Sequence, residues 1–183
     1  GPARLEFGWR TERTRLRPLA AGTVTMRQAL TLVTILMTFG LGILLQLSLT
    51  AIIIGVASVI LVVLYPLAKR VTWYPQAVLG LTFNIGALMG WAAVTNGIIL
   101  PPVLLYIGGF FWTLGYDTIY AHQDSADDGI VGIKSTARKF GERSPIFIAA
   151  FYSIMSLLHF AAGWSLAAGP LFYLIWALAS AHF

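Results

Sequence analysis

Residues Thr50 to Ala68 read TAIIIGVASVILVVLYPLA, a run of apolar and small side chains without a single charge. An α-helix needs roughly 20 such residues to cross the roughly 30 Å of hydrocarbon in a bilayer. Comparable runs follow one another along the chain: Ala29 to Leu49, Gln76 to Thr95, Ile98 to Gly115, Pro145 to Gly163, and Ala167 to the C-terminus. Together with Thr50 to Ala68 they predict six transmembrane helices.

The composition of the chain excludes a soluble core of ordinary size. Of its 183 residues, 58% are hydrophobic and only 10% are charged, which is more apolar surface than one domain of this length can bury. The runs do not alternate as the strands of a membrane barrel do, and a helix satisfies its own backbone hydrogen bonds. The predicted fold class is therefore all-α, a polytopic transmembrane helical bundle. The absence of cysteine excludes disulfides, cysteine-ligated zinc and thiol nucleophiles.

Basic residues mark one side of the predicted membrane protein. All twelve Lys and Arg lie in three stretches, Arg4 to Arg27, Lys69 to Arg70 and Lys134 to Arg143. These stretches alternate with connections that carry no basic residue, as the positive-inside rule predicts for six consecutive crossings. We therefore expect the three stretches on the cytoplasmic or matrix side. For any single one of these residues, setting the topology or contacting anionic lipid is the alternative to a role in a site.

The charges also divide the chain into parts. We expect residues 1–25 to form a basic segment and residues 26–183 a transmembrane domain, with a charged loop of that domain at residues 117–144. Most acidic residues of the chain fall in this loop, among basic ones. They are Asp117, Asp124, Asp127, Asp128 and Glu142, beside Lys134, Arg138, Lys139 and Arg143. A cluster of positive and negative charges at one membrane face indicates a functional site.

The acidic residues have a spacing that suits a metal site. Tyr116 to Lys134 reads YDTIYAHQDSADDGIVGIK, and a helix through it, at about 100° per residue, puts Asp117, Asp124 and Asp128 on one face. Asp127 would lie to the side. Carboxylates stacked in this way repel one another unless a cation lies between them, and Mg²⁺ favours oxygen ligands together with substrate phosphates. The stretch therefore predicts a Mg²⁺-diphosphate site, with a solvated acidic loop as the alternative.

Two polar side chains lie inside predicted membrane spans. Asn84 falls in the run that begins at Gln76, and His159 in the run that begins at Pro145. A polar residue at membrane depth either serves a function or bonds to a neighbouring helix. We expect the second role for both residues.

Four segments resemble the UbiA-type intramembrane prenyltransferases. They are ERTRLRPLAAG at Glu12 to Gly22, YPLAKRVTWYPQAVLG at Tyr65 to Gly80, FNIGALMGWAA at Phe83 to Ala93, and YDTIYAHQDSADDGIVGIKSTARKFG at Tyr116 to Gly141. The resemblance implies a nine-helix bundle, of which the six predicted spans correspond to helices three to eight. The family's first aspartate-rich motif would stand before Glu12 and is not found there, so we expect the chain to be a fragment that lacks this motif.

The resemblance also implies an activity and the residues that serve it. Members of the family transfer a polyprenyl group from a polyprenyl diphosphate to an acceptor with the help of Mg²⁺. The YPxxKR and YDxIYAxxDxxDD patterns favour 4-hydroxybenzoate as the acceptor, as in ubiquinone biosynthesis. By this resemblance the metal ligands are Asp124 and Asp128, with Asp127 and Asp117 close by. The catalytic residues are Asp117 and Lys134, and the substrate-binding residues are Lys134, Arg138, Arg17, Lys69 and Arg70.

Several alternatives stay open on the sequence alone. Other members of the family use homogentisate, dihydroxynaphthoate, haem or glycerol-phosphate lipids as acceptors. A chain with half of the metal site could bind a Mg²⁺-diphosphate without turning it over. A small transporter or channel domain is less favoured, because the charges lie at one face and not at the midplane. The resemblance implies the inner membrane of a bacterium or a mitochondrion, with lipid and no nucleic acid as partner.

Overall fold

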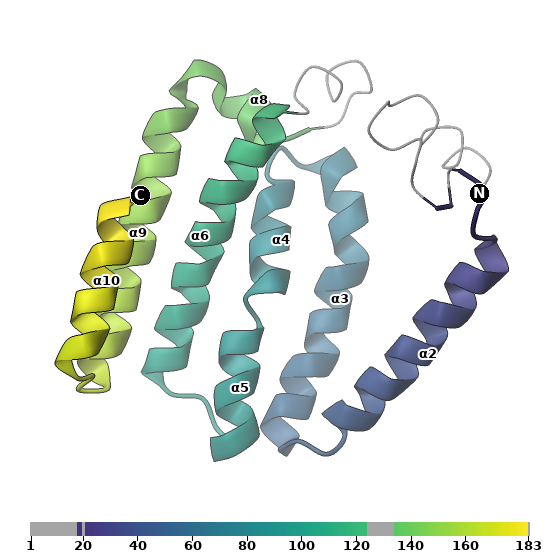
Figure 1. Cartoon of the computed structure of the whole chain (residues 1–183), viewed down its shortest axis with the longest axis horizontal. Coiled ribbons are helices and arrows are strands. Elements are labelled where there is room, and N and C mark those ends of the chain that lie inside the picture. Colours follow the sequence, from purple (N-terminus) through teal and green to yellow (C-terminus); the bar gives the residue numbers. More distant parts are fainter. Residues whose placement is uncertain (1–17, 20, 124–133, 183) are drawn as a thin grey trace. The chain divides into compact units, whose positions relative to one another are not determined.

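The computed structural model describes residues 18–19, 21–123 and 134–182, and every regular element among them is helical. The chain divides into two compact units, Gly1–Gln46 and Leu47–Phe183, which are described separately here. The described helices, labelled as in Figure 1, confirm the predicted fold class. Four helical segments are long and apolar enough to cross a membrane by length and composition: Met26–Leu44, Leu49–Ala68, Pro75–Thr95 and Thr136–Ser165.

The first unit contains one long described helix, α2 (Met26–Leu44). It begins with a capping box: the Gln28 backbone N–H donates to the Thr25 hydroxyl at 3.3 Å, and the Thr25 N–H donates to the Gln28 side chain at 2.9 Å. None of the residues of α2 is buried, including its leucines and isoleucines. An apolar helix with no buried face is stable in lipid, where no water competes for its backbone.

The second unit begins with a helical hairpin whose open end, opposite the turn from α3 to the next helix, is joined by hydrogen bonds. Helix α3 (Leu49–Val71) starts after Ser48, whose hydroxyl accepts the Ala51 N–H at 3.3 Å and donates to the Ala92 carbonyl at 2.5 Å. The Thr50 hydroxyl donates to the Asn96 carbonyl at 2.9 Å. These bonds fix the start of α3 against the end of α5 (Gly86–Thr95).

The third predicted span is broken into two helices, α4 (Pro75–Phe83) and α5 (Gly86–Thr95). The sequence predicts one continuous helix from Gln76 to Thr95, so that prediction is wrong at the Asn84–Ile85 step. Figure 1 shows the interruption between the two ribbons. A break at this depth leaves carbonyl groups without their helical partners, and lipid offers none.

Side chains supply those missing partners. The Asn84 amide donates to the Gly80 carbonyl at 2.8 Å and to the Thr113 hydroxyl at 2.8 Å. The Tyr106 hydroxyl donates to the Leu81 carbonyl at 2.8 Å. Because Thr113 and Tyr106 both belong to α6 (Leu100–Gln123), the break is held by the neighbouring helix. The expectation that Asn84 bonds to a neighbouring helix is confirmed.

Helix α6 carries the largest set of buried residues among the described helices, and many of these are small or hydroxyl residues: Gly108, Gly109, Thr113, Gly115 and Thr118, with Pro101, Pro102 and Leu114. A Cβ added at Gly109 would collide with the Asn84 side chain, and one at Gly115 would lie 2.7 Å from the Tyr152 ring. Small residues let membrane helices approach closely. With 24 residues, α6 is roughly 36 Å long and can span the hydrocarbon, although it is less apolar than the helices named above.

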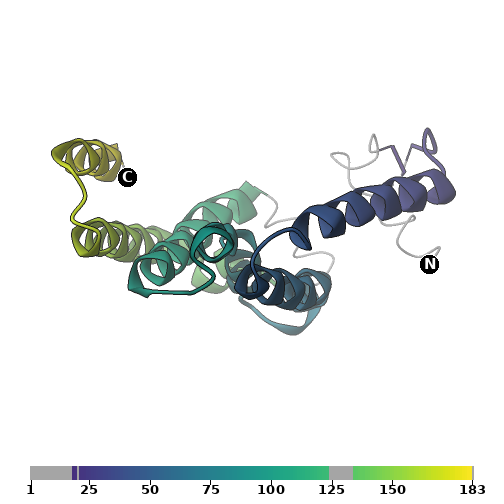
Figure 2. The ribbon, with the colours of Figure 1, turned by 90° about the horizontal axis from the view of Figure 1, so that it is seen from below.

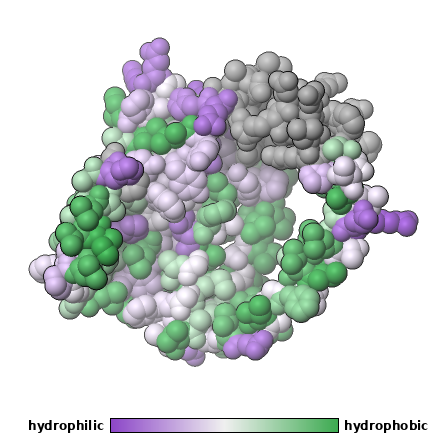
Figure 3. Space-filling model, viewed as in Figure 1, coloured by the Kyte–Doolittle hydropathy of each residue, from purple (hydrophilic) through white to green (hydrophobic). Residues whose placement is uncertain are grey.

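The chain ends in α8 (Thr136–Phe140), η1 (Gly141–Arg143), α9 (Ser144–Ser165) and α10 (Pro170–His182). Helix α9 packs along α6, and α8 is joined to α9 by rings: Phe140 stacks on Phe147 with centroids 4.0 Å apart. Figure 2 shows α10 beside α9 at the edge of the unit. Helix α10 has 13 described residues, fewer than the predicted sixth span. In Figure 3 the outer flank at α10 is largely hydrophobic, whereas the end at α8 is largely hydrophilic.

Candidate functional site

Charged side chains of the second unit gather at one end. The end of α3, the start of α4, the end of α6, the short α8 and the start of α9 all lie there, as Figure 1 shows. The connections from α5 to α6 and from α9 to α10 lie at the opposite end. The basic stretches that the sequence places between these spans therefore share one end of the unit, which we call the charged end.

A buried hydrogen-bond network joins three elements of the charged end. The Thr118 hydroxyl lies 2.6 Å from the Leu114 carbonyl and 2.7 Å from the Thr136 hydroxyl. Because a hydroxyl has one proton and Thr118 gives its own to Leu114, Thr136 is the donor between the two threonines. The Thr136 N–H donates to the Gln76 side-chain carbonyl at 3.2 Å. The network links α6, α8 and α4, and sequence reasoning missed it.

Because this network is buried, loss of one of its hydrogen bonds should lower the free energy of unfolding. Thr118 and Thr136 are fully buried and Gln76 is 4% exposed. A buried donor or acceptor left without its partner costs about 1–3 kcal/mol, more than a satisfied hydrogen bond contributes. The network therefore fixes α8 relative to α4 and α6. A glutamine in the first turn of an apolar helix was the available signal, since a buried amide requires partners.

The basic residues of α8 point away from this buried side. Ser135, Thr136 and Ala137 are buried, whereas Arg138 is partly exposed and Lys139 is exposed. The Ser135 hydroxyl caps α8 by accepting the Arg138 N–H at 3.3 Å. The helix thus anchors itself by one face and presents its cations on the other.

Two aromatic residues between α3 and α4 receive those cations. The Lys134 ammonium and the Arg138 guanidinium each lie 5.8 Å from the centroid of the Trp73 ring. The Lys139 ammonium lies 4.6 Å from the centroid of the Tyr74 ring. These distances are within the roughly 6 Å over which a ring face attracts a cation. Sequence reasoning identified Lys134 and Arg138 but missed Trp73.

Lys134 has a second contact at the charged end. Its ammonium donates to the Val71 carbonyl at 3.3 Å. Val71 is the last residue of α3, where unpaired carbonyls carry partial negative charge. The ammonium is therefore held between the end of α3 and the Trp73 ring.

The predicted metal ligands are described in part. Asp117 lies near the end of α6, half-buried and next to Thr118. Asp124, Asp127 and Asp128 lie outside the described residues. Within 18–19, 21–123 and 134–182, no three His, Asp or Glu side chains come together as a metal site.

The predicted substrate-binding residues are also described only in part. Arg17 lies outside the described residues, and nothing is described of the side chains of Lys69 and Arg70 at the end of α3. Lys134 and Arg138 are described, and the structure brings them together at Trp73. The charged end therefore supplies two cations to one small region.

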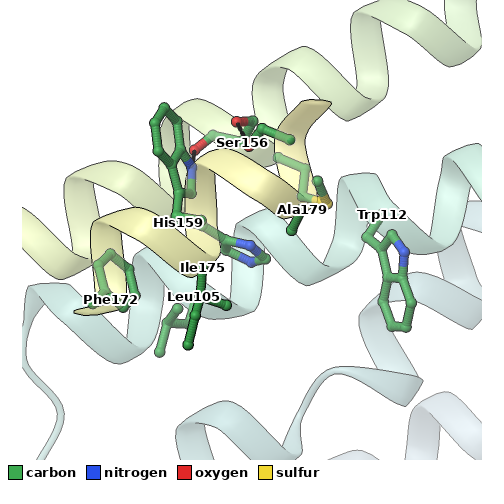
Figure 4. Close-up of a pocket in the computed structure, with 10 residues that line it drawn as sticks. Leu105, Trp112, Ser156, His159, Phe172, Ile175 and Ala179 are labelled. Atoms are coloured by element: carbon green, nitrogen blue, oxygen red, sulfur yellow. Dashed lines mark hydrogen bonds between the residues drawn. The ribbon is translucent and has the colours of Figure 1, made fainter. Parts of the chain in front are cut away.

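A pocket of about 420 Å³ lies between α6, α9 and α10, and none of the residues that line it is Lys, Arg, Asp or Glu (Figure 4). His159 lines it and is hydrogen-bonded to the Leu105 backbone of α6, as the sequence analysis expected of a residue bonded to a neighbouring helix. The Ser156 and Ser180 hydroxyls lie 2.7 Å apart, and the Trp176 indole donates to the Ser156 carbonyl at 2.9 Å. The remaining lining is mostly apolar.

The helical arrangement matches a solved structure. The apo structure of a UbiA homologue from Aeropyrum pernix K1 aligns with a TM-score of 0.83 over 98% of this chain and 68% of that one, at 23% sequence identity. The fold is therefore that of a UbiA-type membrane protein. The model of the UbiA prenyltransferase family matches residues 5–183, and the chain belongs to this family.

Relatives of this chain carry a more specific name. The mitochondrial 4-hydroxybenzoate polyprenyltransferase of Drosophila melanogaster is 46% identical over 157 residues, which cover 85% of this chain and 40% of that protein. The proteins of the same name from Caenorhabditis elegans and Schizosaccharomyces pombe are 50% identical over 147 residues and 41% identical over 182 residues. The matches cover 80% and 97% of this chain, and 41% and 50% of those proteins. The chain spans about half or less of the length of these relatives.

Proposed function

We propose that this protein transfers a polyprenyl group from a polyprenyl diphosphate to 4-hydroxybenzoate, a step of ubiquinone biosynthesis. The observation that carries the proposal is the sequence identity of 41–50% between this chain and proteins named 4-hydroxybenzoate polyprenyltransferase. The cations gathered at the charged end support it, because the donor carries a diphosphate and the acceptor a carboxylate. The mitochondrial names of the relatives favour an inner mitochondrial membrane over a bacterial one, with the charged end facing the matrix.

The chemistry of the transfer defines what the charged end must do. The allylic C–O bond of the donor breaks, its electron pair leaves with the diphosphate, and an allylic cation remains. A ring carbon of 4-hydroxybenzoate attacks this cation, and the ring then loses the proton from that carbon. Fixed positive charge beside the diphosphate stabilises its departure.

Basic side chains are assigned to the two anionic groups. Lys134 and Arg138, with Arg17, would bind the diphosphate through charge-assisted hydrogen bonds. Arg70, with Lys69 beside it, would bind the acceptor carboxylate, for which the planar guanidinium offers two parallel donors. Asp117 is proposed to orient these groups from the end of α6.

The donor set fits Mg²⁺. Asp117 is half-buried near the end of α6, and Asp124 directly follows Gln123, the last residue of that helix in the described part of the chain. Carboxylate oxygens without cysteine are the ligands that Mg²⁺ prefers. Asp124 and Asp128, with Asp127 and Asp117 near them, would hold the ion, which when bound would neutralise charge on the diphosphate.

The proposal assigns different roles to the parts of the chain. Residues 26–183 would form the transmembrane part, in which apolar helices exclude the water that would otherwise capture the allylic cation. The loop at residues 117–144 would carry the metal and diphosphate site. Residues 1–25 would form a basic segment on the same side of the membrane.

The test is prenyl transfer by the protein in lipid nanodiscs. With Mg²⁺, a polyprenyl diphosphate and 4-hydroxybenzoate, we expect prenylated product by mass spectrometry. Asp124→Ala is expected to lower the rate by about 100-fold, and chelation of Mg²⁺ to abolish it until the ion is restored. Glu142→Ala, which removes an exposed carboxylate from η1, is the matched control and should leave the rate unchanged.

Each part of the proposal can fail separately. Full activity in Asp124→Ala would contradict the metal assignment but not the reaction. Product from another aromatic acid, and none from 4-hydroxybenzoate, would contradict the acceptor. No product from the unsubstituted protein would favour the alternative of a catalytically incomplete chain, which binds a Mg²⁺-diphosphate without turnover.

A further inference from the structure

We infer that Trp73 is a positioning residue, whose ring holds Lys134 and Arg138 where the diphosphate of the donor binds. The inference rests on the proposed function for the identity of the anion. Its structural part is independent, because both cationic groups lie 5.8 Å from the centroid of the same indole ring. Tryptophan gives the strongest cation–π attraction of the aromatic side chains.

Two like charges beside one ring form an arrangement that favours an anion. The Lys134 and Arg138 charges are each within 5.8 Å of the Trp73 centroid, so they lie within twice that distance of each other. The ring attracts both cations, which offsets part of the repulsion between them. An anion with more than one charge that lies near both groups would be attracted by each of them. The diphosphate is the substrate group with that charge and size.

The backbone that carries Trp73 is fixed on both sides. The Thr72 N–H donates to the Ala68 carbonyl at 2.9 Å, which closes the end of α3. The Tyr74 N–H donates to the Thr72 hydroxyl at 3.1 Å, and α4 starts at Pro75. A ring on such a backbone can hold other side chains in place.

The cations are fixed to the same helix start as the ring. Gln76 stands three residues after Trp73 and accepts the Thr136 N–H, which lies between Lys134 and Arg138 in the sequence. The buried network thus sets the register of the basic segment against α4. Trp73 then determines where the two charged side chains point.

The surface of Trp73 is only partly covered. The residue is 39% exposed, and two cations lie 5.8 Å from the centroid of its ring. Replacement of the ring removes both the cation contacts and the packing of its covered part, and Trp73→Phe separates these two effects.

The kinetic test uses Trp73→Leu in nanodiscs. We expect kcat/KM for the polyprenyl diphosphate to fall about 5-fold, with the KM for 4-hydroxybenzoate unchanged, because Lys134 and Arg138 bind the diphosphate and stabilise its departure. Trp73→Phe, which retains a weaker ring face, should restore much of this kcat/KM. Trp164→Leu is the matched control, since Trp164 is exposed at the end of α9 away from the charged end. Unchanged kcat and KM for the polyprenyl diphosphate in Trp73→Leu would overturn the inference.

A second readout needs no activity. Limited trypsin digestion of the nanodiscs, read by mass spectrometry, should cleave after Lys134 and Arg138 about 5-fold faster in Trp73→Leu, and nearly at the original rate in Trp73→Phe. Cleavage after Arg27, in the other unit, should not change. Equal cleavage rates in all three proteins would overturn the inference even if transfer is normal. If the unsubstituted protein transfers nothing, the proposed function fails, while the digestion still decides whether Trp73 holds the two cations.

Discussion

Helices α3 and α6 belong to the same unit but differ in how apolar they are and in how many of their described residues are buried. The buried residues of α3 are Ala51, Gly55 and Ala68, while its Ile, Leu and Val side chains are mostly exposed. Helix α6 is less apolar and yet carries the larger set of buried residues, with glycines and threonines among them. In lipid, large apolar side chains gain nothing by leaving their surroundings, so close packing and hydrogen bonds decide which surface is internal. Hydropathy locates these helices but does not find their contacts.

The largest effect should come from a methyl group on the packed face of α6. Gly109→Ala would place a Cβ against the Asn84 side chain, and we expect it to destabilise the fold by about 3 kcal/mol. The measurement is the free energy of unfolding in mixed micelles, followed by circular dichroism.

A matched glycine shows whether packing is the cause. Gly90 is in α5 and has nothing within 4 Å of an added Cβ, so Gly90→Ala should be neutral or stabilise the helix by up to about 1 kcal/mol. Asn84→Ala should reduce the cost of Gly109→Ala, because it removes the colliding group. Equal effects at Gly90 and Gly109 would contradict the comparison of helices.

A smaller effect should follow loss of one hydroxyl at the charged end. Thr136→Val keeps the shape of the side chain but removes the proton that Thr136 donates to Thr118. We expect a loss of about 1 kcal/mol, and faster hydrogen exchange in α8 than in the rest of the unit. Thr95→Val, at an exposed position in α5, is the control. Unchanged exchange in α8 would show that the buried network does not anchor it.

The smallest effect should come from trimming an exposed apolar side chain. Val63 in α3 is 63% exposed, and Val63→Ala should change the free energy of unfolding in lipid by less than about 0.5 kcal/mol. A loss above about 1 kcal/mol, as in a soluble core, would mean that this surface is packed against something.

The sequence predicted features that depend on local composition. Continuous apolar runs predicted the helices, and basic stretches predicted which connections share an end. The break at Asn84 could not be predicted in this way, because the groups that stabilise it, Tyr106 and Thr113, lie more than twenty positions further on. A hydropathy profile contains no information about partners at that separation.

In the candidate site, too, the residues marked by local composition were predicted, and those that depend on tertiary contacts were missed. Lys134 and Arg138 were predicted because charge at the edge of a membrane span is conspicuous in a sequence. Trp73 was missed, since aromatic residues at membrane interfaces are common for other reasons. Gln76 and Thr136 were missed because polar residues near helix ends are usually caps or solvated groups. Their burial depends on tertiary contacts between α4, α6 and α8.

The broken third span also constrains the order of events during membrane insertion. A ribosome releases residues 75–95 before Tyr106 and Thr113, whose side chains bond to the broken segment. An unpaired backbone group in hydrocarbon costs several kcal/mol. The segment must therefore enter the membrane without the groups that stabilise its break, and it reaches its final form only after α6 has inserted beside it. The conformation of the third span therefore depends on the side chains of the fourth, α6.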